Sequence, residues 1–400
     1  MMLASLPMSA EASIPATEAL HVLTLTPFYP NSENDALGCF VAEPLPWIEQ
    51  LGVVNSVIAV RPFYYGRVRP SQAAVPARWS HFVSLPGNFG LSSSGAFLFA
   101  SILPRVRRLH RLNPVHVVHS HSALPCGHAA ALLSRELHIP FVVTVHGLDA
   151  YSTYQMRGRV REWRKRVSQM VYRSASRVIC VSNKVQEQVL QGLTLPANTT
   201  VVYNGVDPQI FAPADGGDNS FGTILSVGGF TPVKGQDSLL RAFAAIHRRF
   251  PNISCELIGE GPERSRVGAL AVDLAIADKV QLRGHQTRSQ VAEAMRRCTL
   301  FALPSRYEGL GCVYLEAMST EKAVIACWGQ GIEEVVQHAE NGWLVDPDDL
   351  SGLSNALSEL LANPGLRRRI GAAARQTILQ NFTLAHQAAR LVQLYRECRA

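Results

Sequence analysis

The chain has 400 residues, of which 47% are apolar and 17% are charged, and its formal net charge is +7. This composition makes a soluble globular chain with enough core for two domains. The longest apolar runs, such as 96–104, fall far short of the roughly 18 residues that indicate a membrane helix. The eight cysteines form no C-x-x-C pair, so they indicate neither a disulfide framework nor a zinc site and favour a reducing cytoplasm.

In the first half of the chain, short apolar runs alternate with helical stretches. Residues 1–19 lack the basic start and the long apolar core of a signal peptide, and we expect them to form a disordered extension. After them, β-branched runs that end in polar residues or glycine predict strands, and the stretches between predict helices. The expected strands are 21–28, 55–63, 115–121, 140–147 and 176–182, and the expected helices are 41–51, 95–112, 125–138 and 157–175.

The second half repeats this alternation after 201–220, a segment rich in Gly, Asp, Asn and Pro that predicts a linker. The expected strands are 222–230, 254–261, 279–285, 299–305, 323–328 and 342–347, and the expected helices are 236–250, 263–276, 288–297 and 350–361. Buried strands that alternate with helices form a parallel, doubly wound sheet. We therefore predict an α/β fold with two tandem Rossmann-like domains, 20–203 and 204–383, facing across a cleft. A last helix at about 384–400 is expected to pack back on the first domain.

The positive charge is concentrated in the first half, where 18 Lys and Arg oppose 10 Asp and Glu. Eight of these cations lie in 157–177, where only Glu162 opposes them. Apolar residues recur there at helical spacing and predict an amphipathic basic helix, namely Val160, Trp163, Val167, Met170 and Val171. Such a face is usually solvated, but it could also meet anionic lipid headgroups or a substrate phosphate. Nucleic acid is not indicated, because no aromatic-rich or helix-turn-helix signature accompanies the charge.

The residues best suited to chemistry stand at the ends of predicted strands, where doubly wound sheets bind ligands. The stretch SVGGFTPVKGQD, 226–237, joins a glycine-rich strand end to Lys234. Its open amides and its ammonium group suit a diphosphate, although it matches neither the Walker pattern nor G-x-G-x-x-G. Taken alone, such a stretch is more often a turn with a surface lysine.

The stretch RYEGLGCVYLEA, 306–317, contains two glutamates eight positions apart, Glu308 and Glu316. On one helix they would lie about 12 Å apart along the axis, too far to share a proton. The glycines beside the first glutamate disfavour a helix, so we predict a loop through Gly311 and a helix from about Cys312. Backbone amides at this helix start would suit an anion. The alternative is an ordinary turn before a helix with one surface acid.

Histidines gather in HVVHSHSALPCGH, 116–128, and at the end of the next predicted strand. His119 and His121 share one face of a strand, but the spacing places no third ligand, so we predict no metal site. His146 ends an apolar strand, faces the supposed cleft and has Asp149 nearby. This position suits a histidine that holds a sugar hydroxyl or assists proton movement, and a satisfied core histidine is the alternative.

Together, these strand-end motifs resemble the retaining nucleotide-sugar glycosyltransferases of glycosyltransferase family four, which have the GT-B fold. The resemblance covers nearly everything from about His21 to the C-terminus. EGLGCVYLEA resembles the family's E-x7-E signature, VGGFTPVKG its phosphate motif and VVYNGVD its interdomain segment. GQGIEEVV and NGWLVDP resemble its late Gly-Gly-Ile-Pro-Glu and N-G segments. VVTVHGLD resembles its active-site histidine strand, and TPFYPNSENDALGCFV its first glycine loop.

The resemblance implies a role for each motif. Glu308 would hold the donor sugar, Glu316 the ribose, and Lys234 the diphosphate, whose charge grows as the glycosidic bond breaks. His146 would lie against the donor sugar, and Gly38 would let the first loop close on the phosphates. The implied catalytic residues are His146, Glu308 and Lys234, and the implied donor-binding residues are Gly38, Gly229, Lys234, Glu308, Gly309, Leu310, Gly311 and Glu316. The two glutamates are then binders and not the acid/base pair of a glycosidase.

Two positions depart from the family pattern. The family usually has an arginine that shares the diphosphate with the lysine, and this chain has Gly229 there, which leaves more to Lys234 and to backbone amides. In the late motif, Glu333 stands where proline is common.

The implied function is retaining transfer of a hexose-type sugar from a nucleotide-diphosphate sugar to a glycan or lipid-linked acceptor, in cell-surface or exopolysaccharide synthesis. We expect no cofactor and no metal. We also expect a cytoplasmic protein, with peripheral binding to the inner face of the cytoplasmic membrane as an alternative placement. A non-catalytic nucleotide-sugar or glycan-binding subunit remains an alternative, as does a nucleotide-sugar 2-epimerase of the same architecture. A dinucleotide-dependent oxidoreductase would need a glycine fingerprint after its first strand, which TPFYPNSENDALG lacks.

Overall fold

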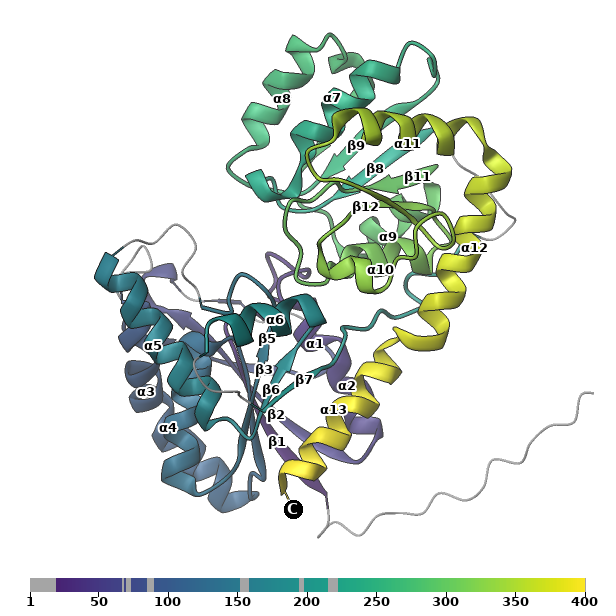
Figure 1. Ribbon diagram of the computed structural model, residues 1–400. Coiled ribbons are helices and arrows are strands. Elements are labelled where there is room, and N and C mark those ends of the chain that lie inside the picture. Colours follow the sequence, from purple (N-terminus) through teal and green to yellow (C-terminus); the bar gives the residue numbers. More distant parts are fainter. Residues whose placement is uncertain are drawn as a thin grey trace, which may run out of the picture.

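The computed structural model describes residues 19–66, 68–69, 73–84, 90–151, 158–193, 198–214 and 222–399. Within them the chain forms two parallel sheets, one in each half, each flanked by helices (Figure 1). The prediction of a disordered extension lies outside the described residues except at residue 19. The two doubly wound sheets predicted from the alternation of strands and helices are confirmed.

The first sheet has the strand order β3-β2-β1-β4-β5-β6-β7 in the described chain. Its strands are β1 (Leu20–Thr26), β2 (Val53–Pro62), β3 (Ala77–Phe82), β4 (Val117–His121), β5 (Phe141–Val145), β6 (Arg177–Cys180) and β7 (Thr199–Val201). All neighbouring strands pair in parallel. The strand order reverses between β1 and β4, and a crevice at such a reversal is where ligands bind in this class of sheet.

Helices cover both faces of the first sheet, because alternate residues along each strand point to opposite faces. The helical elements of this half are α1 (Cys39–Ala42), α2 (Pro44–Gln50), η1 (Phe63–Tyr65), α3 (Leu91–Leu112), η2 (Ala123–Gly127), α4 (His128–Leu137), α5 (Gly158–Ser174) and α6 (Asn183–Gln191). Leu23 and Val118 pack in one core with α3, α4 and α5. Val22 and Val117 pack in a second core with α1, α2 and the last helix of the chain.

The second sheet has the strand order β10-β9-β8-β11-β12-β13 in the described chain, with the reversal between β8 and β11. Its strands are β8 (Thr223–Val227), β9 (Ser254–Ile258), β10 (Val280–Arg283), β11 (Leu300–Ala302), β12 (Val324–Cys327) and β13 (Trp343–Val345). The helical elements are η3 (Pro232–Lys234), α7 (Gln236–Ile246), α8 (Arg264–Asp273), η4 (Ala277–Lys279), α9 (Arg288–Arg297), α10 (Cys312–Ser319), η5 (Gly331–Glu334), α11 (Leu350–Ala362), α12 (Pro364–Asn381) and α13 (Leu384–Arg399).

The chain returns to the first sheet at its C-terminal end (Figure 1). α12 lies along the second domain, and α13 continues from it to pack on α2 and β4. The crossing point is tied to the interdomain segment by two backbone hydrogen bonds, from Val206 N to Phe382 O at 2.9 Å and from Leu384 N to Val206 O at 3.1 Å. None of the described helices has the length and apolar character that crossing a membrane requires.

Candidate functional site

A cleft of about 320 Å³ lies between the carboxyl ends of the two sheets. The first domain contributes Phe40 and His146 to its wall, and the second domain contributes Lys234, Arg288 and the loop that precedes α10. Seven of the predicted site residues line it, namely His146, Lys234, Glu308, Gly309, Leu310, Gly311 and Glu316. Gly38 and Gly229 do not line it, but each is the neighbour of a residue that does.

Lys234 and Glu308 form an ion pair inside the cleft. Lys234 Nζ lies 2.6 Å from Glu308 Oε1, which also accepts a hydrogen bond from Ser305 Oγ at 3.0 Å. Gly235 has a left-handed φ of 68°, and a Cβ there would lie 2.0 Å from the carbonyl oxygen of Pro304. Only glycine therefore lets the turn that carries Lys234 approach the loop that carries Glu308. The predicted sugar binder and the predicted diphosphate binder are brought together.

Glycines also allow the two domains to touch beside this pair. A Cβ on Gly309 would lie 2.1 Å from the carbonyl oxygen of His146, across the domain boundary. Gly311 has a φ of 86° and directly precedes α10, which begins at Cys312 as predicted. Gly38 has a φ of 69°, and a Cβ there would lie 2.3 Å from the carbonyl carbon of Phe28. These contacts explain the glycines by close packing, which leaves their roles in donor binding as predictions.

Glu316 is held by Arg288, a residue that no motif singled out. Arg288 is the first residue of α9, and Thr287 and Gln290 fix its position through a capping box. Its Nη1 donates to Glu316 Oε1 at 2.5 Å, while Nε and Nη2 donate to Glu43 at 2.8 and 3.0 Å. Because Glu43 belongs to the first domain, this guanidinium joins both domains to the predicted ribose binder.

The electrostatics of this cluster follow from its burial. Burial raises the pKa of Glu43, and the nearby Arg288 guanidinium only partly reverses that effect. Burial also works against the charge of Arg288, but Glu316, Cys39 and Glu43 outweigh it, so the pKa of Arg288 lies above its usual value. The Cζ atom of Arg288 also lies 4.8 Å from the centroid of the Phe211 ring. Arg288 is thus a permanent cation in the cleft, committed to two carboxylates.

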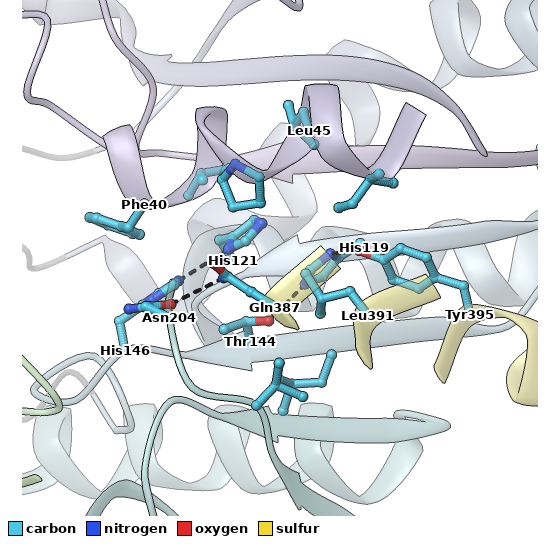
Figure 2. A pocket seen from close by; sticks show the side chains of 15 residues that line it. Phe40, Leu45, His119, His121, Thr144, His146, Asn204, Gln387, Leu391 and Tyr395 are labelled. Carbon is cyan, nitrogen blue, oxygen red and sulfur yellow. Dashed lines mark hydrogen bonds between the residues drawn. The ribbon is translucent and has the colours of Figure 1, made fainter. Parts of the chain in front are cut away.

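His146 contacts the cleft and a second histidine. Its Nε2 lies 3.1 Å from Nδ1 of His121, and the Phe40 ring packs 4.6 Å from its ring centroid (Figure 2). The Asp149 carboxylate accepts a hydrogen bond from the backbone N–H of His146 at 2.8 Å, and His146 Nδ1 has no hydrogen-bond partner among the described residues. Burial lowers the pKa of His146 to about 3, so the ring is neutral near neutral pH. A neutral imidazole suits a hydrogen bond to a hydroxyl better than the delivery of a proton.

Burial also raises the pKa of the Asp149 carboxyl, to about 6, despite hydrogen bonds from backbone amides.

Among the described residues, no group of three or more His, Cys, Asp or Glu is placed to hold a metal ion.

Glu334, the last residue of the late motif, caps a helix of the other domain. Its carboxylate accepts hydrogen bonds from the backbone N–H groups of Asn183 and Lys184, both at 2.8 Å. These are the first two residues of α6, where amides have no partner within the helix. Ser182 adds a third link by donating to the carbonyl oxygen of Gly309 at 2.5 Å. The motif could be found in the sequence, but the helix that it caps could not.

The basic helix predicted in 157–177 forms as α5, with Arg157 outside the described residues. Its expected apolar face is wrong in one respect, because Trp163 is 47% exposed whereas Arg164 is 1% exposed. The buried side also includes Val171 and Tyr172. Arg159, Arg161, Arg166 and Arg173 remain exposed. The outer face of α5 is therefore basic with one exposed tryptophan. Among the described residues, no contact shows what this face binds, so lipid or phosphate binding there stays a prediction.

Two family models match the chain, one for each half. The model described as "Glycosyltransferase Family 4" matches residues 55–210, and "Glycosyl transferases group 1" matches residues 215–377. An uncharacterised glycosyltransferase of Methanocaldococcus jannaschii is 33% identical over 64% of this chain and 68% of its own length. The alpha-maltose-1-phosphate synthase of Mycolicibacterium smegmatis is 31% identical over 71% of this chain and 79% of its own.

The fold also matches solved structures. HepE of Anabaena, solved in complex with UDP and glucose, superposes with a TM-score of 0.74 at 20% identity, over 94% of this chain and 99% of that one. At this identity the match speaks for the fold alone. The family models, the relatives above 30% identity and the two facing sheets show that the chain belongs to the family 4 glycosyltransferases and has the GT-B fold.

Proposed function

We propose that the protein transfers a hexose-type sugar from a nucleotide-diphosphate sugar to a glycan or lipid-linked acceptor, with retention of the anomeric configuration. The observation that carries this proposal is the Lys234–Glu308 ion pair, which lies in a cleft closed on the other side by His146. One site thus offers a cation for a diphosphate, a carboxylate for sugar hydroxyls and a neutral imidazole. HepE was solved with UDP and glucose, and a relative is named for an α-linked maltosyl product, which supports the donor class and the stereochemistry.

The proposed chemistry places charge stabilisation on the second domain. Lys234 meets the donor diphosphate, and so do the backbone amides at the start of α10, where the helix dipole favours an anion. Negative charge on the leaving diphosphate grows as the glycosidic bond breaks, so these groups bind the transition state more tightly than the donor. Glu308 holds donor-sugar hydroxyls, and Glu316 holds the ribose. The neutral ring of His146 accepts or donates one hydrogen bond at the sugar.

We further propose that the reaction needs no cofactor and no bound divalent metal, because Lys234 and the helix-end amides take the charge. The acceptor then binds to the first domain, near loops 29–40 and 62–95 and close to α5. We propose that the protein acts in cell-surface or exopolysaccharide synthesis. Its location is the cytoplasm or the inner face of the cytoplasmic membrane. This placement rests on the exposed cations of α5 and on the resemblance of the motifs.

A donor panel tests the proposal. UDP-, GDP- and ADP-sugars are first scored by thermal shift, and the stabilising donors are then assayed for nucleotide release with and without EDTA. We expect one donor class to stabilise the protein and to release nucleotide equally in both conditions. Activity that is lost with EDTA and restored by Mg²⁺ or Mn²⁺ would remove the metal-free proposal. Donor binding without release would favour a non-catalytic subunit, and an epimerised nucleotide sugar would favour the 2-epimerase.

A further inference from the structure

Two buried histidines, His119 and His121, and the half-buried His146 form a row from the last helix to the cleft (Figure 2). His119 and His121 lie two positions apart on β4, so their side chains point to the same face of the sheet. His146 follows the neighbouring strand β5. The ring centroids of His119 and His121 lie 4.4 Å apart, and those of His121 and His146 lie 5.3 Å apart with ring planes only 15° from parallel. The chemistry proposed above uses His146 alone, so the other two rings need an explanation.

The far end of the row is fixed by two hydroxyl groups. His119 Nδ1 lies 2.7 Å from the hydroxyl of Tyr395 on α13, and its Nε2 lies 2.7 Å from Thr144 Oγ1 on β5. Both ring nitrogens of His119 are thus engaged, and its ring packs against that of His121 at an angle of 33°. The three histidines line a small cavity beside α2 and α13, and the near end of the row opens on the donor cleft, because His146 lines both spaces.

The hydrogen bond between His121 and His146 couples the protonation of the two rings. Burial holds the pKa of His121 well below its usual value and that of His146 at about 3, so both rings are neutral. A neutral imidazole carries one N–H and one bare nitrogen. The 3.1 Å contact between His121 Nδ1 and His146 Nε2 therefore contains a single proton. Whichever ring supplies that proton also decides whether His146 Nδ1 is a donor or an acceptor.

His146 Nδ1 is the nitrogen left over for a substrate. It is buried and has no hydrogen-bond partner among the described protein atoms. Nothing else in the described chain orients the ring by a hydrogen bond, because its Nδ1 has no partner there and its Nε2 contacts His121. Without His121, the ring of His146 would keep its packing against Phe40 but could flip or change tautomer.

We propose that His121 is a positioning residue for sugar transfer, whose Nδ1 holds His146 in one orientation and one tautomer so that His146 Nδ1 meets a hydroxyl of the donor sugar. The inference rests on the proposed function for the identity of that hydroxyl. The restraint that His121 places on the His146 ring does not depend on the proposed function. A misplaced ring leaves the nucleotide contacts of the second domain intact and weakens only the contact at the sugar, so the loss falls on kcat.

Three substitutions at one position separate hydrogen bonding from packing. In His121→Asn the side-chain amide can replace Nδ1, in His121→Gln it reaches the place of Nε2, and in His121→Phe the ring remains without a polar atom. We expect kcat to fall about 10- to 100-fold in the Phe and Gln variants and to stay within about threefold of the wild type in the Asn variant. Nucleotide affinity should not change. Equal kcat in the Asn and Gln variants would overturn the proposal.

His21→Phe is the matched control. His21 is another buried histidine of the same sheet, and its Nε2 lies 2.9 Å from Ser56 Oγ at the opposite end of the strands. Its replacement should lower the free energy of unfolding and leave kcat per folded molecule unchanged. A similar loss of kcat in this control would mean that the effect of His121→Phe is one of general destabilisation.

A spectroscopic measurement tests the restraint without any activity. In protein labelled with ¹⁵N-histidine, with the His146 signals assigned through His146→Gln, we expect one tautomer of His146 in the wild type and a mixture in His121→Phe. The same tautomer in both would overturn the positioning role. If the wild type releases no nucleotide from any donor, the proposed function fails, and this measurement still decides whether His121 restrains His146.

Discussion

Two cations line the donor cleft, and they are not equally free. Arg288 is committed to Glu43 and Glu316, whereas Lys234 has a single carboxylate partner and two further N–H donors for a phosphate. We therefore expect Lys234→Ala to lower kcat/KM by about 100- to 1000-fold, because the charge of the leaving diphosphate loses its cation. Lys234→Arg, which keeps the charge, should lose less. Near-normal kcat/KM in the alanine variant would show that the backbone amides carry the diphosphate alone.

The companion substitution is Gly229→Arg, which restores the arginine usual in the family. A Cβ on Gly229 would meet only the carbonyl oxygen of Glu260 at 3.5 Å, an ordinary contact, and the backbone there is not left-handed. The fold should therefore tolerate the side chain, and nucleotide binding should become tighter. Unchanged nucleotide affinity would count against a diphosphate at this turn.

Arg288 and Glu316 should act on the nucleotide as one unit. If Glu316 holds the ribose, Arg288 fixes the orientation of its carboxylate through their hydrogen bond, so removing either one disturbs the same contact. Glu316→Gln and Arg288→Gln should each weaken nucleotide binding about tenfold, and the double variant should be no weaker than about tenfold. A loss near 100-fold in the double variant would mean that the two residues act independently. Arg296→Gln, at an exposed ion pair on the same helix, is the control.

At the scale of elements, the sequence predicted most strands because buried parallel strands are β-branched runs, as in 140–147 and 176–182. It missed β3 (ARWSHF), where exposed and buried positions alternate and polar residues interrupt the apolar pattern, and the three-residue strand β7 (TTV). It also misjudged the buried face of α5 by one position. A 3.6-residue period fits two adjacent stripes when both contain apolar residues, and tertiary contacts decide between them. Here Tyr172 donates to the carbonyl oxygen of Ala150, and Arg164 is buried on the same helix.

The outer face of α5 gives a prediction about membranes. Arg159, Arg161 and Arg166 are exposed beside Trp163, and each cation near an anionic surface contributes about 1 kcal/mol. We expect salt-sensitive flotation with phosphatidylglycerol vesicles that weakens about 100-fold when these three arginines become Gln. Arg164 is left unchanged, because it is buried and its loss would report on folding. Replacing Arg241, Arg248 and Arg249 on the second domain removes the same charge as a control, and no flotation at low salt would reject lipid contact.

The histidines of β4 predict acid sensitivity. Burial lowers the pKa of His119 from 6.5 to about 3, so between these values the unfolded chain binds a proton that the folded chain does not. Stability then rises with pH through this window and is lost as the pH falls, by about 1.4 kcal/mol per pH unit for each such histidine. Burial raises the pKa of Asp149 to about 6, so between pH 3.8 and 6 this carboxyl makes stability fall as the pH rises. It is a single group that opposes the effect of the histidines.

Urea unfolding between pH 6 and 5 measures this slope. His119→Phe should lower stability at pH 7, because Thr144 and Tyr395 lose their partner, yet it should flatten the pH dependence by about 1.4 kcal/mol per pH unit. His138→Asn, at an exposed position, should leave the slope unchanged. An equal slope in the wild type and the His119 variant would show that His119 is protonated in the folded protein.

At the scale of the whole molecule, the residues that join the domains were the hardest to predict. Glu308, Glu316, Lys234 and His146 could be found because each belongs to a local motif at a strand end. Arg288 and Glu43 are 245 positions apart, in different domains, and neither belongs to a motif. Their pairing depends on how the two sheets face each other, which no local pattern encodes. The same holds for Glu334, whose motif is visible but whose partner helix is 150 positions away.

Glu334 therefore gives the prediction that tests the arrangement of the two domains. Its carboxylate accepts from two amides at the positive end of α6, a charge-assisted contact that contributes roughly 1.5–3 kcal/mol. Glu334→Ala should speed hydrogen exchange at Asn183 and Lys184 by about 10- to 100-fold, because their N–H groups lose their only acceptor among the described residues. The radius of gyration in X-ray scattering should also increase as the domains separate.

Glu333→Ala is the matched control, because among the described residues this neighbouring carboxylate accepts only from Gly329 N, within the same loop. It removes the same charge from the same motif and should change neither exchange at α6 nor the radius of gyration. Faster exchange without a larger radius would mean that Glu334 caps α6 but that Ser182 and Arg288 suffice to hold the domains. Equal hydrogen exchange at α6 in the two variants would show that Glu334 does not cap this helix. It would also contradict the assignment of Glu334 as the residue of the late motif that holds the first domain.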